Sequence, residues 1–336
     1  MNTINPGNSA SDLFFTDRRS AIERMEDELR EAQGKLCRAR TAASRRHVRR
    51  EVCRVRMDLA WEFLHCGAFK KAFDQLVRVP WRNSGQSKCI GMAWALDQGL
   101  GRSDEARRLL DAGLATHPDS APLLLAMGNW HHVKGLFVQS LEYFERARLL
   151  DPHRPEYALS CANALYELTC YEDAAEIYRT LAREAEDCPG PDPNFAVMCR
   201  SQIGYCSLLC NRPEDAMASF QACLEVNPDF EDAYNGLFCA YHDRGMLTDA
   251  IDIARKGIRK FPVTDSRLYH NLAIAYLELD WTDDARGLLR KGLEIFPEDP
   301  HLTEFLKVLD EDGGDDGRND KPTVLLLIRS HVDRRR

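Results

Sequence analysis

The feature that most constrains the fold of this chain is a small residue that returns every 34 positions. It stands at Ala72, Ala106, Ser140 and Ala174. After a break it resumes at Ala216 and Ala250, and Ala285 follows one residue late. Several glycines five residues before it and several prolines twelve residues after it keep the same phase. A fixed period of this length is typical of stacked supersecondary units, each of which buries its apolar face only against its neighbours. The repeat therefore predicts an elongated array, whose function lies on a binding surface more than in a catalytic pocket.

Each repeat is predicted to consist of two helices. In the third repeat we expect one helix over 122–133, a turn at Gly135 and a second helix over 138–149. Met127, Gly128 and His131 follow Leu124 at i+3, i+4 and i+7, which is the spacing of one helix face. The second helix ends before Pro152, because the residue that precedes a proline is disfavoured in the helical conformation.

These positions resemble the tetratricopeptide repeat family. The matching residues of the third repeat are Gly128, Ser140, Phe144, Ala147 and Pro152. Those of the fifth are Gly204, Ala216, Phe220, Cys223 and Pro228, and those of the seventh are Leu272, Ala273, Tyr276, Ala285 and Pro297. The resemblance implies an all-α, right-handed superhelical solenoid of about seven helix-turn-helix units. We place these units at 53–86, 87–120, 121–154, 155–188, 197–230, 231–264 and 266–299. Trp94 and Phe238 depart from the pattern, because they replace the family's small eighth residue.

The chain is expected to have five regions. They are a disordered N-terminus over 1–15, an amphipathic and basic helical region over 16–52, the solenoid over 53–299, a capping helix over 300–310 and a flexible tail over 311–336. Three prolines at about 189–196 predict an inserted loop, which is either a linker that preserves the stacking or a hinge. The tail is acidic at first, and then carries the aliphatic run 324–328, which either docks back onto the solenoid or binds a partner.

The N-terminal region suggests two further functions. Apolar residues over 17–43 alternate spacings of three and four, so this helix either covers the first repeat or forms a short coiled-coil dimer, and Gly34 and the alanines favour covering. Eight arginines between Arg38 and Arg56 form a basic stretch, which is either a solvated helix face or a site for nucleic acid or another anionic surface. Nucleic acid is not the expected partner, because no aromatic residues interleave with these arginines and the net charge of the chain is −8.

The sequence contains no motif of known catalytic or cofactor-binding sites, so neither an enzyme nor a cofactor is expected. Cys199, Cys206 and Cys210 lack the histidine pair or second cysteine pair that would complete a metal site, and we interpret them as small core residues. The twelve cysteines are scattered, which favours a reducing compartment. No signal pattern or membrane-spanning run is present in the sequence, and the expected location is the cytoplasm.

The resemblance places the binding surface on the concave face, which the first helix of each unit lines in this family. The residues expected there are Asn129, His132, Asn163, Gln202, Tyr205, Asn235, His242, Arg267 and Asn271. An asparagine side chain both donates and accepts hydrogen bonds, so the four asparagines either form a ladder for a peptide backbone or are ordinary exposed residues. The family's carboxylate clamp is not expected, because Leu125 and Leu159 replace its first lysine. The predicted function is a non-enzymatic scaffold or adaptor that binds a protein or peptide.

Overall fold

A computed structural model describes residues 10–80, 85–187, 194–263 and 266–312 of the chain, and every regular element in these ranges is helical. The contacts divide the chain into two compact units, Met1–Ser160 and Cys161–Arg336, which we call unit 1 and unit 2. The division falls inside one helix, α8 (Pro155–Glu167), and not at the loop predicted near 189–196. The predicted all-α array of helix pairs is confirmed in both units.

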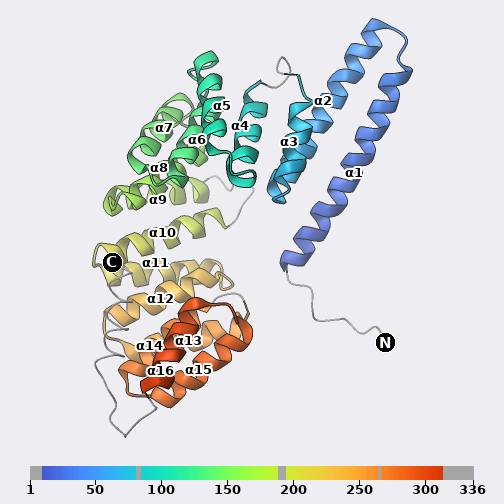
Figure 1. The fold of residues 1–336 in the computed structure, drawn as a ribbon. Coiled ribbons are helices and arrows are strands. Elements are labelled where there is room, and N and C mark those ends of the chain that lie inside the picture. Colours follow the sequence, from blue (N-terminus) through green and yellow to red (C-terminus); the bar gives the residue numbers. More distant parts are fainter. Residues whose placement is uncertain (1–9, 81–84, 188–193, 264–265, 313–336) are drawn as a thin grey trace. The chain divides into compact units, whose positions relative to one another are not determined.

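Unit 1 contains a long helical hairpin followed by stacked helix pairs (Figure 1). Its helices are α1 (Ala10–Arg38), α2 (Ala42–His65), α3 (Phe69–Val77), α4 (Gly85–Trp94), the π-helical turn η2 (Ala95–Gly99), α5 (Ser103–Thr116), α6 (Ala121–Val133), α7 (Phe137–Leu150) and the first turns of α8. Each of α2, α4 and α6 packs against the helix that follows it, as the repeat predicted.

The boundaries of the N-terminal helices differ from the prediction. Helix α1 begins at Ala10, so residues 10–15 are helical rather than disordered, and residues 1–9 lie outside the described part. It ends at Arg38 instead of continuing to 43, because Thr41 caps the next helix by accepting a hydrogen bond from Ser44 N at 3.1 Å. Helix α2 then runs through the expected boundary at 52. Leu29 and Ala32 of α1 are buried in a core that includes residues of α2.

Unit 2 continues the same pattern. Its helices are the end of α8, α9 (Tyr171–Asp187), α10 (Phe195–Leu209), α11 (Pro213–Val226), α12 (Glu231–Asp243), α13 (Leu247–Lys260), α14 (Ser266–Glu278), α15 (Thr282–Ile295) and α16 (Pro300–Asp312). Helices α9 and α10, which flank the predicted loop, pack extensively against each other. Residues 188–193 and the tail over 313–336 lie outside the described residues, as does the predicted aliphatic run. Leu302, Phe305 and Leu309 bury one face of α16.

Small residues and aromatic rings fit together between the helices. A Cβ atom on Gly128 would lie 2.4 Å from the Phe144 ring, and one on Gly204 would lie 2.6 Å from the Phe220 ring. Both phenylalanines are fully buried. A small residue therefore packs against an aromatic ring in both units. Trp94 cannot pack in this way, and the helix continues beyond it as the π-helical turn η2.

The turns between paired helices share one conformation. Gly67, Gly101, Gly135 and Gly245 have positive φ angles of 63–72°. The remaining three turns place a non-glycine residue in the same conformation, at Thr169, Asn211 and Asp280. A left-handed residue closes a helix by directing the following N–H groups back to its last carbonyl groups. The conformation is thus kept throughout the array, although the glycine is not.

Candidate functional site in each unit

Unit 1 carries a groove formed by three adjoining cavities. Their volumes are about 560, 310 and 280 Å³. The first and second cavities share Trp61 and Ser87, and the second and third share Ile90, Ala126 and Asn129. We call this surface the tryptophan groove; its lining also includes Arg50, Arg54, Met57, Trp94, Asp97, Leu125, Trp130, Glu156 and Tyr157. These side chains come from α2, α4, η2, α6 and the start of α8, so the first helices of successive repeats build one continuous surface.

The middle of the tryptophan groove is aromatic and apolar. The rings of Trp61 and Trp94 are partly exposed, and their centroids are 6.0 Å apart. Trp130 is held in place, because its Nε1 donates a hydrogen bond to Ser103 Oγ at 3.0 Å. The guanidinium group of Arg107 lies 5.4 Å from the centroid of the same ring. Fixed aromatic surfaces of this kind bind apolar side chains with little loss of conformational entropy.

Charged groups lie at both ends of the tryptophan groove. Arg50 and Arg54 line the first cavity, and Asp97 lines the third. The Asp97 carboxylate is largely buried and forms an ion pair with Lys134 at 3.0 Å. Burial by itself would raise the pKa of Asp97, but hydrogen bonds with Ser103, Lys134 and Gln98 outweigh it, and the pKa lies below its usual value. Two arginines and Asp58 therefore line one end of the groove, and a buried, ionised acid lies at the other.

The structure separates the two site residues predicted in unit 1. Asn129 is exposed and lines two of the three cavities. His132 is partly buried and packs edge-on against Phe137, with ring centroids 5.2 Å apart, and it lines none of the three cavities. The sequence prediction missed Trp61, although it occupies the same position of its repeat as Asn129. Its repeat position could have indicated Trp61 as a site residue, but the prediction considered only polar side chains at that position.

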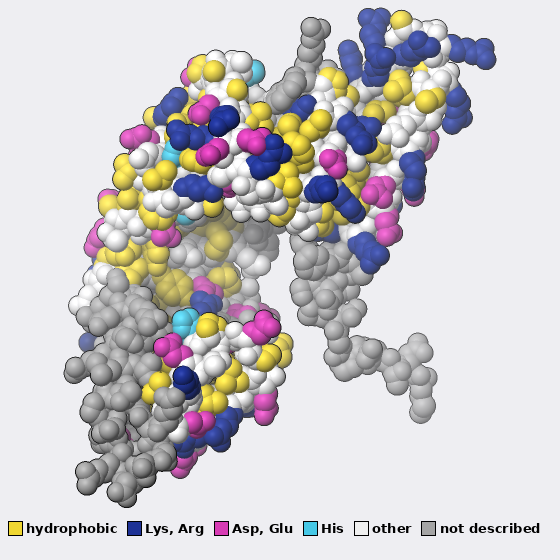
Figure 2. All heavy atoms as spheres, in the orientation of Figure 1, with side chains coloured by type: hydrophobic (Ala, Val, Ile, Leu, Met, Phe, Trp, Pro, Cys, Tyr) yellow, Lys and Arg dark blue, Asp and Glu magenta, His cyan; other side chains and the backbone are white. Residues whose placement is uncertain are grey.

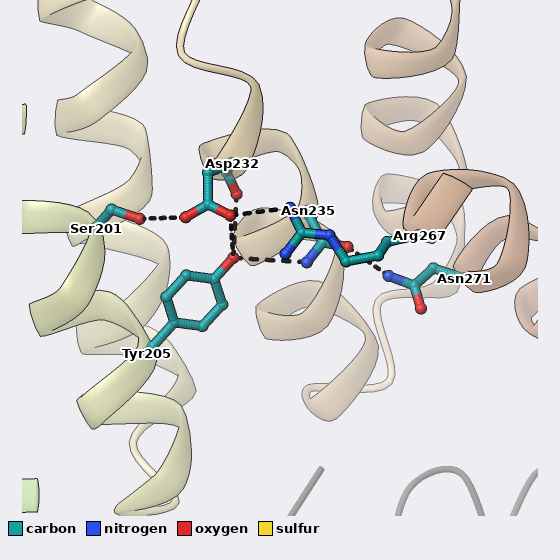
Figure 3. Close-up of polar contacts among 6 residues, drawn as sticks. All are labelled: Ser201, Tyr205, Asp232, Asn235, Arg267 and Asn271. Atoms are coloured by element: carbon teal, nitrogen blue, oxygen red, sulfur yellow. Dashed lines mark hydrogen bonds and ion pairs between the residues drawn. The ribbon is translucent and has the colours of Figure 1, made fainter. Parts of the chain in front are cut away.

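Unit 2 holds a network of polar side chains around Asp232 (Figure 3). Ser201 Oγ donates a hydrogen bond to Asp232 Oδ2 at 2.9 Å, and Tyr205 OH donates one to Oδ1 at 3.1 Å. Arg267 Nη2 also contacts Oδ1 at 3.1 Å. Burial and the charge of Asp232 both raise the pKa of Tyr205, so its phenol stays protonated and acts as a donor.

Two of the predicted ladder asparagines belong to this network. Asn271 Nδ2 donates to Asn235 Oδ1 at 2.6 Å, and Asn235 Nδ2 lies 3.5 Å from Tyr205 OH. Asn235 is only 6% exposed and Asn271 only 2%. The expectation that both would present free amides to a peptide is wrong, because their amides bond to each other in the interior. They connect α12 and α14.

The other predicted residues of unit 2 are dispersed. Asn163 is exposed, and its Oδ1 accepts a hydrogen bond from Tyr178 OH at 2.6 Å. Gln202 is partly exposed, and about half of the Arg267 side chain is exposed. His242 stacks on Phe238 and approaches Glu278 Oε1 to 2.9 Å. Asn163, Gln202 and Arg267 are therefore the accessible members of the predicted set in this unit.

The described residues contain no group of three or more histidine, cysteine or acidic side chains that could hold a metal ion. Burial raises the pKa of the Cys199 and Cys206 thiols to about 12, so both stay protonated, as expected of core cysteines. No helix in the described ranges combines the length and apolar character needed to cross a bilayer.

Comparison with known families identifies the repeats. A sequence model described as tetratricopeptide repeat matches residues 200–230 and 266–299, which contain most of α10–α11 and the pair α14–α15. These two segments are tetratricopeptide repeats. Proteins of this fold are typically non-enzymatic interaction scaffolds.

Two solved structures share the fold of this chain. A tetratricopeptide repeat protein of Parabacteroides merdae ATCC 43184 is 14% identical, with a TM-score of 0.56 over 77% of this chain and 98% of its own. Yeast Tom70 is 13% identical, with a TM-score of 0.57 over 98% of this chain and 69% of its own. These identities show the fold alone.

Two curated relatives share parts of the sequence. A mitochondrial pentatricopeptide repeat-containing protein of Arabidopsis thaliana is 28% identical over 166 residues, which cover 48% of this chain. The tetratricopeptide repeat-containing protein YpiA of Bacillus subtilis (strain 168) is 20% identical over 241 residues, or 62% of this chain. The chain spans 17% of the length of the first relative and 55% of the second.

Proposed function

We propose that this tetratricopeptide repeat protein is a non-enzymatic scaffold or adaptor, and that it binds a peptide segment of a protein partner in the tryptophan groove of unit 1. The observation that carries the proposal is the continuity of the three cavities through shared residues of α2, α4 and α6. A continuous groove on the first helices of several repeats suits an extended or helical segment better than a single small molecule.

The lining of the groove indicates the chemistry of the bound segment. Trp61, Ile90 and Leu125 offer partly exposed apolar surface in the second cavity. The second and third cavities, at about 310 and 280 Å³, lie at the lower end of the range for small-molecule pockets, which is roughly 300–1,000 Å³. We therefore expect bulky apolar side chains of the partner to occupy the second and third cavities. Asn129 stands between these two cavities, where its exposed amide can bond to the partner's backbone.

The groove variant Leu125→Glu tests the proposal. It places a charge in the second cavity, and we expect the affinity for a groove-bound segment to fall at least tenfold, because a carboxylate there would lose its hydration on binding. Leu149→Glu is the matched control, because Leu149 is 78% exposed and lines none of the three cavities. Peptides selected by wild-type protein from a displayed random library provide the ligands, and fluorescence anisotropy measures their binding.

The result that supports the groove is the selection of peptides rich in bulky apolar residues, which Leu125→Glu no longer binds and Leu149→Glu still binds. Equal binding by all three proteins would place the site elsewhere. A parallel affinity capture of natural partners, analysed by mass spectrometry, should lose the same proteins with Leu125→Glu alone. The cytoplasmic location and an oligomer formed through 17–43 remain predictions, which fractionation and light scattering test.

A further inference from the structure

The tip of the α1–α2 hairpin carries a second surface, which adjoins the first cavity of the tryptophan groove at Arg50. Six exposed arginines lie there, at Arg38, Arg40, Arg45, Arg46, Arg49 and Arg50, and we call them the arginine tip. Figure 2 shows them as a dark blue cluster at the end of the hairpin. The sequence has no aspartate or glutamate between Glu31 and Glu51. This local excess of positive charge occurs in a chain whose net charge is −8.

The charges on the hairpin stem are neutralised, whereas those of the arginine tip are not. On the stem, Arg54 contacts Glu28 at 2.8 Å, and Lys35 contacts Glu31 at 3.0 Å. At the tip, Arg38 and Arg45 bond only to the backbone oxygens of residues 34 and 39. No side-chain carboxylate within the described part of the chain forms an ion pair with any of the six arginines.

The arginines of the tip destabilise helix α2. Arg45 and Arg49 are one turn apart on α2, as are Arg46 and Arg50, and like charges at this spacing repel each other. The beginning of a helix also favours acidic residues, and α2 has none in its first turn. Like charges that destabilise the chain at a protruding end, with no compensating contact, indicate a partner outside the chain.

We propose that the arginine tip binds an acidic segment of a protein partner. Arginine forks bind carboxylates in a bidentate manner, and all six side chains are exposed. The choice of a protein as partner rests on the proposed function, because Arg50 belongs both to the tip and to the first cavity of the tryptophan groove. A partner held in the groove can therefore extend an acidic flank over the tip.

Two other anionic partners fit the tip less well. The described residues 38–50 expose no phenylalanine, tyrosine or tryptophan that would stack on bases or enter a bilayer, and Val48 is buried. On the stem next to the tip, Asp27, Glu28 and Glu31 pair with Arg30, Arg54 and Lys35, so these pairs offer no excess positive charge to the evenly spaced phosphates of a longer nucleic acid. A short acidic peptide concentrates its charge on the tip alone.

Binding of a labelled poly-glutamate peptide to the full chain tests the proposal, with a single-stranded RNA of equal charge and anionic phospholipid vesicles as alternative ligands. We expect the peptide to bind at low salt and the double variant Arg46→Ala/Arg49→Ala to bind it about tenfold more weakly. The matched control is Arg108→Ala/Arg148→Ala, which removes the same charge from two exposed arginines of α5 and α7 and should change the affinity less than about twofold.

The outcomes separate this inference from the proposed function. Leu125→Glu should leave the binding of poly-glutamate unchanged, and the tip variant should leave the binding of a purely apolar groove peptide unchanged. The proposal is overturned if wild-type protein does not bind the peptide, if both double variants lose affinity equally, or if RNA or vesicles bind more tightly than the peptide.

Discussion

The turn that follows helix α8 contains a residue in the left-handed conformation, which glycine adopts in other repeats of this chain. Thr169 has a φ of 61°, and its backbone N–H reaches back to Tyr166 O at 3.0 Å. A left-handed conformation costs an L-residue about 1–2 kcal/mol, because its Cβ approaches the following carbonyl oxygen, and threonine is branched at this atom. Replacement by glycine would remove that strain.

The variant Thr169→Gly should therefore stabilise the protein. Glycine also makes the unfolded chain more flexible, and this conformational entropy offsets about 0.4–1 kcal/mol of the gain in the free energy of unfolding. The expected net increase in the free energy of unfolding is about 0.5–1 kcal/mol, which for a unit of this size corresponds to a rise in Tm of roughly 1–4 °C. Urea unfolding followed by circular dichroism measures it.

Gly245→Thr is the matched reverse variant in the same unit. Gly245 has a φ of 70°, and a Cβ atom built on it would meet no atom within 4 Å, so the cost is purely conformational. We expect it to lose about 1 kcal/mol of stability. Asn211→Gly should change little, because asparagine adopts the left-handed conformation readily. If Thr169→Gly were no more stable than wild type while Gly245→Thr lost stability, backbone strain at Thr169 would be refuted as an energetic factor.

Two further predictions concern the polar residues of each unit. Asn271→Ala should lower the free energy of unfolding by about 1–3 kcal/mol, because it leaves the buried Asn235 Oδ1 without its donor. The control Asn129→Ala, at an exposed site, should change the free energy of unfolding by less than about 0.5 kcal/mol. Equal losses in urea unfolding would contradict this assignment. Arg46→Ala/Arg49→Ala should instead stabilise the chain by about 0.5–1 kcal/mol at low salt, because it relieves two like-charge pairs. The gain should shrink at high salt, and Arg108→Ala/Arg148→Ala should not show this salt dependence.

The repeat predicted the helix pairs because packing imposes the same requirement in every unit. Gly128 and Phe144 had to lie against each other, since only a small residue leaves room for the ring. The N-terminal boundary could not be obtained in this way, because it depends on a single cap at Thr41 rather than on a period. Thr169 shows a similar limit: the conformation of the turn is periodic, but the residue that adopts it is not.

The candidate site was harder to predict than the fold, because repeat position determines where a side chain lies but not what it bonds to. Asn129 and Asn235 were assigned to the same face from similar patterns. Asn129 is exposed and borders two cavities, whereas Asn235 is buried, donates a hydrogen bond to Tyr205 and accepts one from Asn271. That difference depends on neighbours in other helices.

The two units thus use the face formed by their first helices in different ways. In unit 2, hydrogen bonds from Ser201 to Asp232 and from Asn271 to Asn235 link three successive first helices, and the polar groups in these bonds are not available to a peptide. In unit 1, Trp61 and Leu125 stand on the corresponding helices, and apolar side chains leave cavities that no hydrogen bond closes. Burial of apolar surface is then a large favourable term for a ligand in this groove. A partner bound there should accordingly show a negative heat-capacity change in calorimetry, and a heat-capacity change near zero would show that the apolar groove is not where it binds.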